Sequence, residues 1–197
     1  MPVSHAVEVL FWLALGIVVY AYAGYGVCVR ILALLRPRPA REGSAQPTVS
    51  LIVPAYNEAS YLASKLENSL ALDYPPDRFE ILVISSGSSD GTELIANGYG
   101  AHGVRTLIQP TRGGKEMAMQ EAARHAKGEI LVFTDANVTV EPESFTNLDR
   151  YFADPEVGCV CGHLLYLNRE QSVTAATGAD YWRLEEAIKQ LESDTGS

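Results

Sequence analysis

One stretch of the sequence limits the possible folds more than any other: residues 9–29 (VLFWLALGIVVYAYAGYGVCV), 21 residues without a charge. As an α-helix this stretch would be about 30 Å long, which is the thickness of the hydrocarbon core of a bilayer. Trp12 and Tyr25 lie near its two ends, where aromatic side chains are favoured at membrane interfaces. No Lys or Arg precedes the stretch, unlike in a signal peptide. No polar face interrupts it, as one would in a buried globular helix. We therefore predict an N-terminal transmembrane anchor over residues 1–30.

The charges around this anchor predict its orientation. Four arginines follow the apolar stretch within a few residues: Arg30, Arg36, Arg38 and Arg41. The positive-inside rule therefore places the N-terminus outside the cell membrane (a plasma or inner membrane) and the rest of the chain in the cytoplasm. Residues 31–47 are rich in proline and arginine and are typical of an extended linker. The net charge of −9 excludes a nucleic-acid-binding surface as a main function.

From residue 48 onward, stretches typical of strands and helices alternate. The expected strands are 49–56, 79–85, 103–109, the apolar part of 129–140, and 157–167. The expected helices are 57–72, a short one within 89–100, 113–126, 142–153 and 180–192. In the first helix, Leu62, Leu66 and Leu70 recur every four residues and form an apolar face. This alternation predicts an α/β domain over residues 48–197, with a mostly parallel sheet and helices on both faces.

Polar residues cluster where the expected strands end. Tyr56, Asn57 and Glu58 follow the first strand, residues 85–90 follow the second, and Asp135 and Asn137 follow the apolar run EILVF. Because ligands of such sheets bind at the carboxyl ends of the strands, we expect these groups to share one crevice.

Asp135 raises a question of its own, because a carboxylate at the tip of a buried strand is costly unless it is compensated. A divalent cation, Mg²⁺ or Mn²⁺, bound by the oxygens of Asp135 and Asn137 would offset that cost and hold a diphosphate. Lys115 could add a positive charge near the phosphates. The alternatives at this point are an aspartate that caps a turn and a lysine on a solvated helix.

The presence or absence of other motifs limits the kinds of ligand site that the sequence can contain. No GxGxxG follows the first strand and no GxxxxGK[ST] occurs, which disfavours a dinucleotide-binding site and a P-loop ATPase. The segment GSSDGT, residues 87–92, fits a ligand loop and fits equally a turn with a helix cap. Alternation along a strand would put Cys159, Cys161 and His163 on one face. A zinc site needs a fourth ligand, so we expect packed thiols there instead.

Taken in order, residues 49–92, the RGGK segment and GEILVFTDAN resemble family 2 glycosyltransferases of the GT-A (Rossmann-like) fold. The similarity is greatest to the membrane-bound branch that includes cellulose, hyaluronan and poly-N-acetylglucosamine synthases. The resemblance implies a nucleotide-diphosphate sugar, with a UDP-sugar as the expected donor, and a glycan or lipid acceptor. It also implies a set of nucleotide-sugar-binding residues: Pro54, Ala55, Tyr56, Glu58, Ser86, Asp90, Lys115 and Asp135. The DxD motif of the family corresponds to Asp135 and Asn137, which would bind the metal.

Two differences from the family pattern affect the expected function. Relatives carry an aspartate that accepts a hydrogen bond from the base where this chain has Ser86, and Asn137 replaces a second aspartate. The family's general base belongs to a motif that we do not find before Ser197, so we expect this chain to lack that base. Two hypotheses follow: an inverting, metal-dependent glycosyltransferase, or a non-catalytic nucleotide-sugar-binding protein, scaffold or inactive fragment.

Overall fold

The computed structural model describes residues 2–43, 46–163, 165 and 185–196. The chain divides into two compact units. One unit comprises residues 42–160, and the other comprises residues 1–41 together with 161–197. The predicted boundary near residue 47 remains a prediction.

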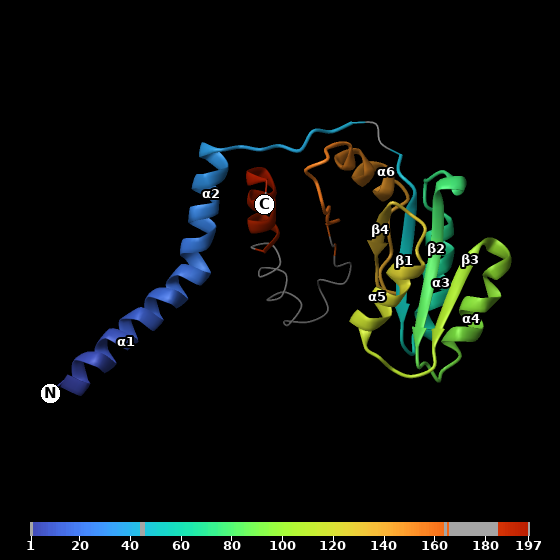
Figure 1. Ribbon diagram of the computed structural model, residues 1–197, viewed down its shortest axis with the longest axis horizontal. Helices are drawn as coiled ribbons and strands as arrows, with labels where there is room; N and C mark the ends of the chain where they lie inside the picture. Colours follow the sequence, from blue (N-terminus) through green and yellow to red (C-terminus); the bar gives the residue numbers. More distant parts are fainter. Residues whose placement is uncertain (1, 44–45, 164, 166–184, 197) are drawn as a thin grey trace. The chain divides into compact units, whose positions relative to one another are not determined.

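The larger unit is built on one parallel sheet of four strands (Figure 1). Its strands are β1 (Val49–Ala55), β2 (Phe79–Ser86), β3 (Val104–Gln109) and β4 (Ile130–Phe133). Their order across the sheet is β3-β2-β1-β4, so the first strand lies inside the sheet between the second and the fourth. Ala55 pairs with Ser85, and Ser86 pairs with Gln109. The carboxyl ends of β1, β2 and β3 therefore meet at one edge of the sheet.

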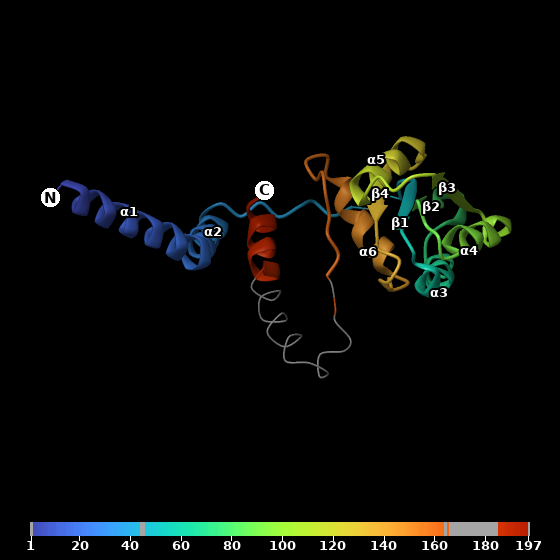
Figure 2. The same cartoon turned by 90° about the horizontal axis from the view of Figure 1, so that it is seen from below.

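Helices cover both faces of this sheet, as predicted (Figure 2). The helices and helical turns are α3 (Ala59–Leu70), η2 (Pro76–Arg78), α4 (Thr92–Gly98), η3 (Gly100–His102), α5 (Lys115–His125), α6 (Ser144–Asp149) and η4 (Arg150–Ala153). On one face Leu51 and Val53 of β1 pack in a core with α3, α4 and α6. On the other face Ile52 packs with Leu82, Ile84 and the alanines of α5. Because β1 and β2 are buried on both faces, their sequences read as continuous apolar runs.

The fourth strand differs from the prediction. The run EILVF was expected inside the sheet, yet among the described strands β4 lies at the edge and pairs through four residues with β1 alone. Leu131 and Phe133 are consequently 37% and 43% exposed. The side chain of Asp135 is 51% exposed, so the expectation that burial makes this carboxylate costly is wrong.

The smaller unit contains the apolar N-terminal segment. It forms α1 (Pro2–Val19), a π-helical turn η1 (Tyr20–Gly24) and α2 (Tyr25–Leu35). Residues His5–Leu35 are long and apolar enough to cross a membrane, and among the described residues this is the one such helix. Residues 185–195 are helical, and Glu192 accepts a hydrogen bond from the hydroxyl of Tyr25.

The predicted strand over residues 157–167 is not observed where the structure describes it. Residues 157–163 form neither strand nor helix, and both Cys159 and Cys161 are exposed. The expectation of packed thiols on one strand face is therefore wrong. Residues 164 and 166–167 of that prediction, and residues 180–184 of the predicted final helix, lie outside the described residues.

Candidate functional site

A cavity of about 260 Å³ opens at the carboxyl ends of the strands. Eight residues expected at a nucleotide or metal site line it: Pro54, Ala55, Tyr56, Glu58, Ser86, Lys115, Asp135 and Asn137. Four more residues complete the lining: Arg112, Gly114, Ala118 and Ala136. The segments that follow β1, β2, β3 and β4 thus converge on one cavity, although they lie up to about 80 positions apart in the sequence.

The loops after β1 and β2 hold each other in place. Asn57 has a left-handed backbone (φ 56°), and its side-chain oxygen accepts a hydrogen bond from the N–H of Ser89 at 2.9 Å. Its own N–H donates to the hydroxyl of Ser88. One residue later, the N–H of Glu58 donates to the hydroxyl of Thr92 at 2.9 Å. These bonds fix the wall of the cavity that carries Tyr56 and Glu58.

Asp90 does not line the cavity. Its two carboxylate oxygens accept hydrogen bonds from the hydroxyl and N–H of Thr92 and from the N–H of Ala59. These bonds, the one from the Thr92 hydroxyl first, lower the pKa of Asp90. In the structure, therefore, Asp90 ties the start of α4 to the start of α3.

Ser86 lies at the floor of the cavity and is 4% exposed. Its hydroxyl oxygen accepts a hydrogen bond from the N–H of Gly113 at 3.0 Å. Next to it, Gly87 has φ +68°, and a Cβ there would lie 2.8 Å from the backbone nitrogen of Arg112. Only glycine allows this approach without strain. The loop after β2 therefore packs directly against the RGGK segment.

Arg112 is a cavity residue that the sequence prediction missed. Its guanidinium carbon lies 4.1 Å from the centroid of the Tyr56 ring, a cation–π contact. The signal was available, because Arg112 opens the RGGK segment in which Lys115 was singled out. Its aromatic partner follows a different strand, and sequence spacing does not reveal such a pairing.

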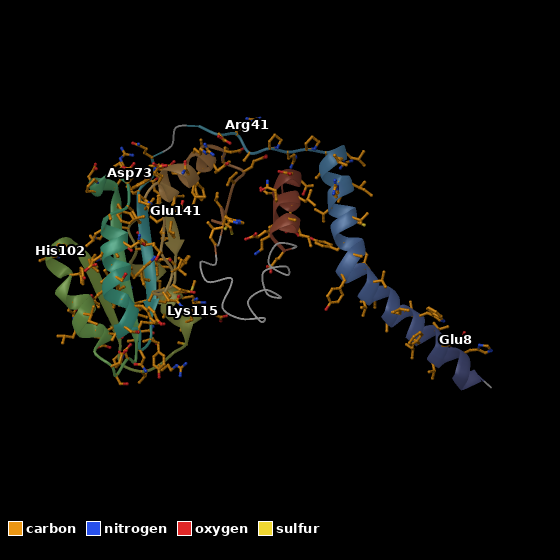
Figure 3. All side chains as sticks on the ribbon, turned by 180° about the vertical axis from the view of Figure 1, so that it is seen from behind. Glu8, Arg41, Asp73, His102, Lys115 and Glu141 are labelled. Atoms are coloured by element: carbon orange, nitrogen blue, oxygen red, sulfur yellow. The ribbon has the colours of Figure 1, made fainter. Side chains whose placement is uncertain are left out.

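Lys115 and Asp135 form an ion pair across the cavity mouth. Nζ of Lys115 lies 2.5 Å from Oδ1 of Asp135, and the two side chains are 59% and 51% exposed. Figure 3 shows Lys115 toward one end of the sheet, with Asp73 toward the other. An exposed pair of this kind adds little to stability.

The donor atoms near Asp135 fit a hard divalent cation that is completed by a ligand. Asp135 and Asn137 offer a carboxylate and an amide oxygen to the same cavity. Within the described part of the chain, no group of three or more His, Cys, Asp or Glu is placed to hold a metal ion. One or two protein oxygens with substrate phosphates are the usual set for Mg²⁺, whereas tight structural zinc needs more protein ligands.

A buried lysine contacts the turn at residues 134–138, which carries Asp135 and Asn137. Lys65 is 3% exposed, and its Nζ donates to Oγ1 of Thr134 at 3.0 Å and to the carbonyl oxygen of Val138 at 2.9 Å. Burial lowers the pKa of Lys65 to about 8, and the negative charge of Asp135 opposes that shift. The sequence prediction missed Lys65, although a lysine one position before Leu66 on an apolar helix face was a visible signal.

A second, more open hollow of about 540 Å³ lies elsewhere in the same unit. It is lined by Glu67, Leu70, Ala71, Gly98, Tyr99 and His102. None of the residues predicted for nucleotide or metal binding belongs to it. The smaller cavity at the strand ends therefore remains the candidate site.

Comparison with known proteins identifies the family of this chain. Residues 50–192 match Glycosyl transferase family 2. A dolichyl-phosphate β-glucosyltransferase of Trichomonas vaginalis is 30% identical over 122 residues, 58% of this chain and 36% of that protein. A poly-β-1,6-N-acetyl-D-glucosamine synthase of Staphylococcus epidermidis is 26% identical over 151 residues, 76% of this chain and 36% of that protein. The chain thus spans about a third of the length of these relatives.

The fold has solved counterparts. A mannosyltransferase from Pyrobaculum calidifontis, in complex with GDP-Man and Mn²⁺, superposes with a TM-score of 0.62 and 32% identity, over 73% of this chain and 45% of that one. TarS of S. aureus, at 23% identity and a TM-score of 0.51 over 64% of this chain and 24% of that one, shares the fold. The motifs, the parallel sheet and the match over most of the sequence lead to one conclusion: the chain belongs to glycosyl transferase family 2.

Proposed function

We propose that the cavity at the strand ends binds a nucleotide-diphosphate sugar together with Mg²⁺ or Mn²⁺, for inverting transfer of the sugar to a glycan or lipid acceptor. The observation that carries the proposal is the convergence of Asp135, Asn137, Lys115 and Tyr56 on one cavity. An aromatic ring, a cation and two oxygen ligands are the groups that a base, a diphosphate and a metal ion require. The GDP-Man and Mn²⁺ of the Pyrobaculum mannosyltransferase support this reading.

Each group has a distinct role in the proposed complex. Tyr56 and Ser86 both line the cavity and would contact the nucleoside. Asp135 and Asn137 would hold the cation, which supplies positive charge to the diphosphate leaving group. Lys115 can exchange its present partner for a phosphate, because its ion pair with Asp135 is exposed and weakly held.

We expect a UDP-sugar as donor, from the resemblance of the loop after β1 to that of UDP-dependent relatives. Ser86 bears on this choice. Its hydroxyl already accepts from Gly113, and it keeps one proton to donate. A carboxylate at this position could only accept. A UDP and a GDP titration, run side by side, distinguish the two nucleotides.

Membrane attachment is part of the proposal. The helix His5–Leu35 supports an anchor, and the arginines after residue 29 favour a cytoplasmic position for the larger unit. Such a position would give the cavity access to cytoplasmic nucleotide sugars.

A second candidate function is nucleotide-sugar binding without transfer. Ser86 favours it, because relatives carry a carboxylate there. Measuring nucleotide release distinguishes the two functions. A transferase releases UDP or GDP from its donor in the presence of an acceptor, and a binding protein does not.

The binding proposal is tested by calorimetry on the 197-residue chain in detergent, with UDP and with GDP, each in MnCl₂ and in EDTA. We expect one nucleotide to bind more tightly in MnCl₂ than in EDTA. In Asp135→Asn, the ratio of the affinity in MnCl₂ to that in EDTA should be at least tenfold smaller than in the parental chain. Glu141→Gln is the matched control, since Glu141 is exposed and does not line the cavity. Equal affinities of the parental chain in MnCl₂ and EDTA for both nucleotides would contradict metal-dependent donor binding.

A further inference from the structure

The turn that carries Asp135 and Asn137 is held in place by contacts with β1 and with α3. It begins after β4, where the N–H of Thr134 still donates to the carbonyl oxygen of Ile52 at 3.1 Å. Within it, the N–H of Val138 donates to the carbonyl oxygen of Asp135 at 3.2 Å. Further support for the turn comes from side chains of α3.

Lys65 supports both ends of this turn at once. One ammonium hydrogen bonds to the hydroxyl of Thr134, directly before Asp135, and another bonds to the carbonyl of Val138, directly after Asn137. The ammonium group thus spans the two oxygen ligands without bonding to either. A lysine with 3% exposure is rare unless its hydrogens are used, and here they bond to the Thr134 hydroxyl before the proposed cation ligands and to the Val138 carbonyl after them.

A separate pair of bonds holds the chain further along. The side chain of Asn68, three residues after Lys65, donates to the carbonyl of Val140 at 2.8 Å and accepts from its N–H at 2.9 Å. This contact secures the exit of the segment but lies outside the 134–138 turn. Lys65 and Asn68 therefore offer a matched pair: both make side-chain contacts from the same helix, and only the contacts of Lys65 lie on either side of Asp135 and Asn137.

The charge of Lys65 and its hydrogen bonds act in opposite directions on a bound cation. A buried positive charge below the turn repels a divalent ion, so its removal alone would strengthen metal binding. Loss of the two hydrogen bonds would instead release Thr134 and Val138 and let the ligand oxygens drift apart. The direction in which metal binding changes when Lys65 is removed therefore shows whether its charge or its hydrogen bonds dominate.

We propose that Lys65 is a positioning residue, which sets the spacing and orientation of Asp135 and Asn137 for the cation without touching the donor. Such supporting contacts often matter almost as much as the ligands themselves. This inference rests on the proposed function of the cavity. It adds a residue that neither the cavity lining nor the ligand motif contains.

The test compares Lys65→Met, Thr134→Val and the double variant with the parental chain, all 197 residues long and in detergent. The readout is the ratio of the UDP dissociation constant in EDTA to that in MnCl₂, with GDP used in place of UDP if GDP is the nucleotide bound. We expect each single variant to lower this ratio at least fivefold while the value in EDTA stays within about twofold. The ratio of the double variant should be no lower than that of Lys65→Met, because both changes remove the bond between Lys65 and Thr134.

Asn68→Ala is the control, and it should lower thermal stability while leaving the ratio within about twofold. An unchanged or increased ratio in Lys65→Met would overturn the positioning role and leave Lys65 as a structural or electrostatic residue only. If Lys65→Met does not fold, Thr134→Val decides the matter by the same criterion. A ratio of one in the parental chain would contradict the proposed function itself, and with it this inference. A parental ratio above one that the variants preserve would contradict this inference alone.

Discussion

Arg112 and Tyr56 form a cation–π contact within the cavity lining. The guanidinium carbon lies 4.1 Å from the ring centroid, and both residues line the cavity. Removing it takes away a planar cation from the wall against which we expect the base to stack. Arg112→Ala should therefore weaken UDP or GDP binding in EDTA about three- to tenfold, in line with roughly 1 kcal/mol for such a contact.

The measurement is calorimetry on the 197-residue chain, and Arg124→Ala provides the control. Arg124 is an exposed arginine whose partner is Glu121 on the same helix, outside the cavity. Equal weakening in both variants would mean that the effect is one of net charge rather than of the Tyr56 contact.

Tyr74 predicts a pH dependence of stability. Burial raises its pKa to about 12, and its hydroxyl donates to the carbonyl oxygen of Pro47 at 2.7 Å. Because the folded pKa lies above the unfolded value of 10, the folded state holds this proton more tightly. The resulting stability is fully present below pH 10 and is lost as the pH rises toward 12.

Tyr74→Phe should cost about 1 kcal/mol of unfolding free energy at pH 8, from the lost hydrogen bond. That difference from the parental chain should shrink by about 1 kcal/mol between pH 9 and pH 11, since one pKa unit corresponds to about 1.4 kcal/mol. Urea unfolding followed by circular dichroism measures both values. A difference that stays constant over this range would show that Tyr74 does not titrate as described.

Single residues also show the limit of prediction from sequence. Motif order sufficed to place eight residues around one cavity, because strand ends in a parallel sheet meet at one edge. Lys65 and Arg112 were missed for a common reason: each acts through a partner on a distant segment. Asp135 was identified for a burial cost that it does not bear, as its side chain is half exposed.

Among the elements, the loops after β2 and β3 come into close contact at Gly87. A methyl group there would meet the backbone nitrogen of Arg112 at 2.8 Å, and the residue has φ +68°. Gly87→Ala should lower the melting temperature and weaken nucleotide binding together, because both loops must move apart. Gly98→Ala, at the end of α4, would place its methyl group in open space with no atom within 4 Å, so it should be neutral or slightly stabilising.

Thermal unfolding by circular dichroism and calorimetry with UDP or GDP on the two glycine variants check this prediction. Gly87→Ala with the melting temperature and affinity of the parental chain would show that the loops have more room than the structure indicates.

At the level of elements, continuous apolar runs predicted β1 and β2 closely, because both faces of these strands are covered. The same criterion misplaced β4, which is apolar yet lies at the edge with two half-exposed side chains. It also predicted a strand over residues 157–167, and the structure has none at residues 157–163. Strand pairing decides these cases, and pairing is a property of the whole sheet.

For the molecule as a whole, the predicted orientation in the membrane is open to a labelling experiment. Cys161 is exposed and follows the larger unit in the chain. In a Cys28→Ala, Cys159→Ala variant, a membrane-impermeant maleimide should label Cys161 in inside-out vesicles and not in right-side-out ones. Detergent-solubilised protein serves as the positive control. Labelling in right-side-out vesicles alone would reverse the proposed orientation.

The strand order β3-β2-β1-β4 has a consequence for folding during synthesis. β1 can pair with β2 once residue 86 has been made, but its other side must wait for residues 130–133. Until then β1, an apolar strand that is almost fully buried in the folded sheet, presents an edge of unpaired backbone N–H and C=O groups, the kind of surface on which nascent chains aggregate. Synthesis of some forty further residues at about 5–20 residues per second leaves that edge unpaired for seconds. Slow translation between residues 87 and 133 should therefore reduce the yield of soluble folded protein more than slow translation before residue 49.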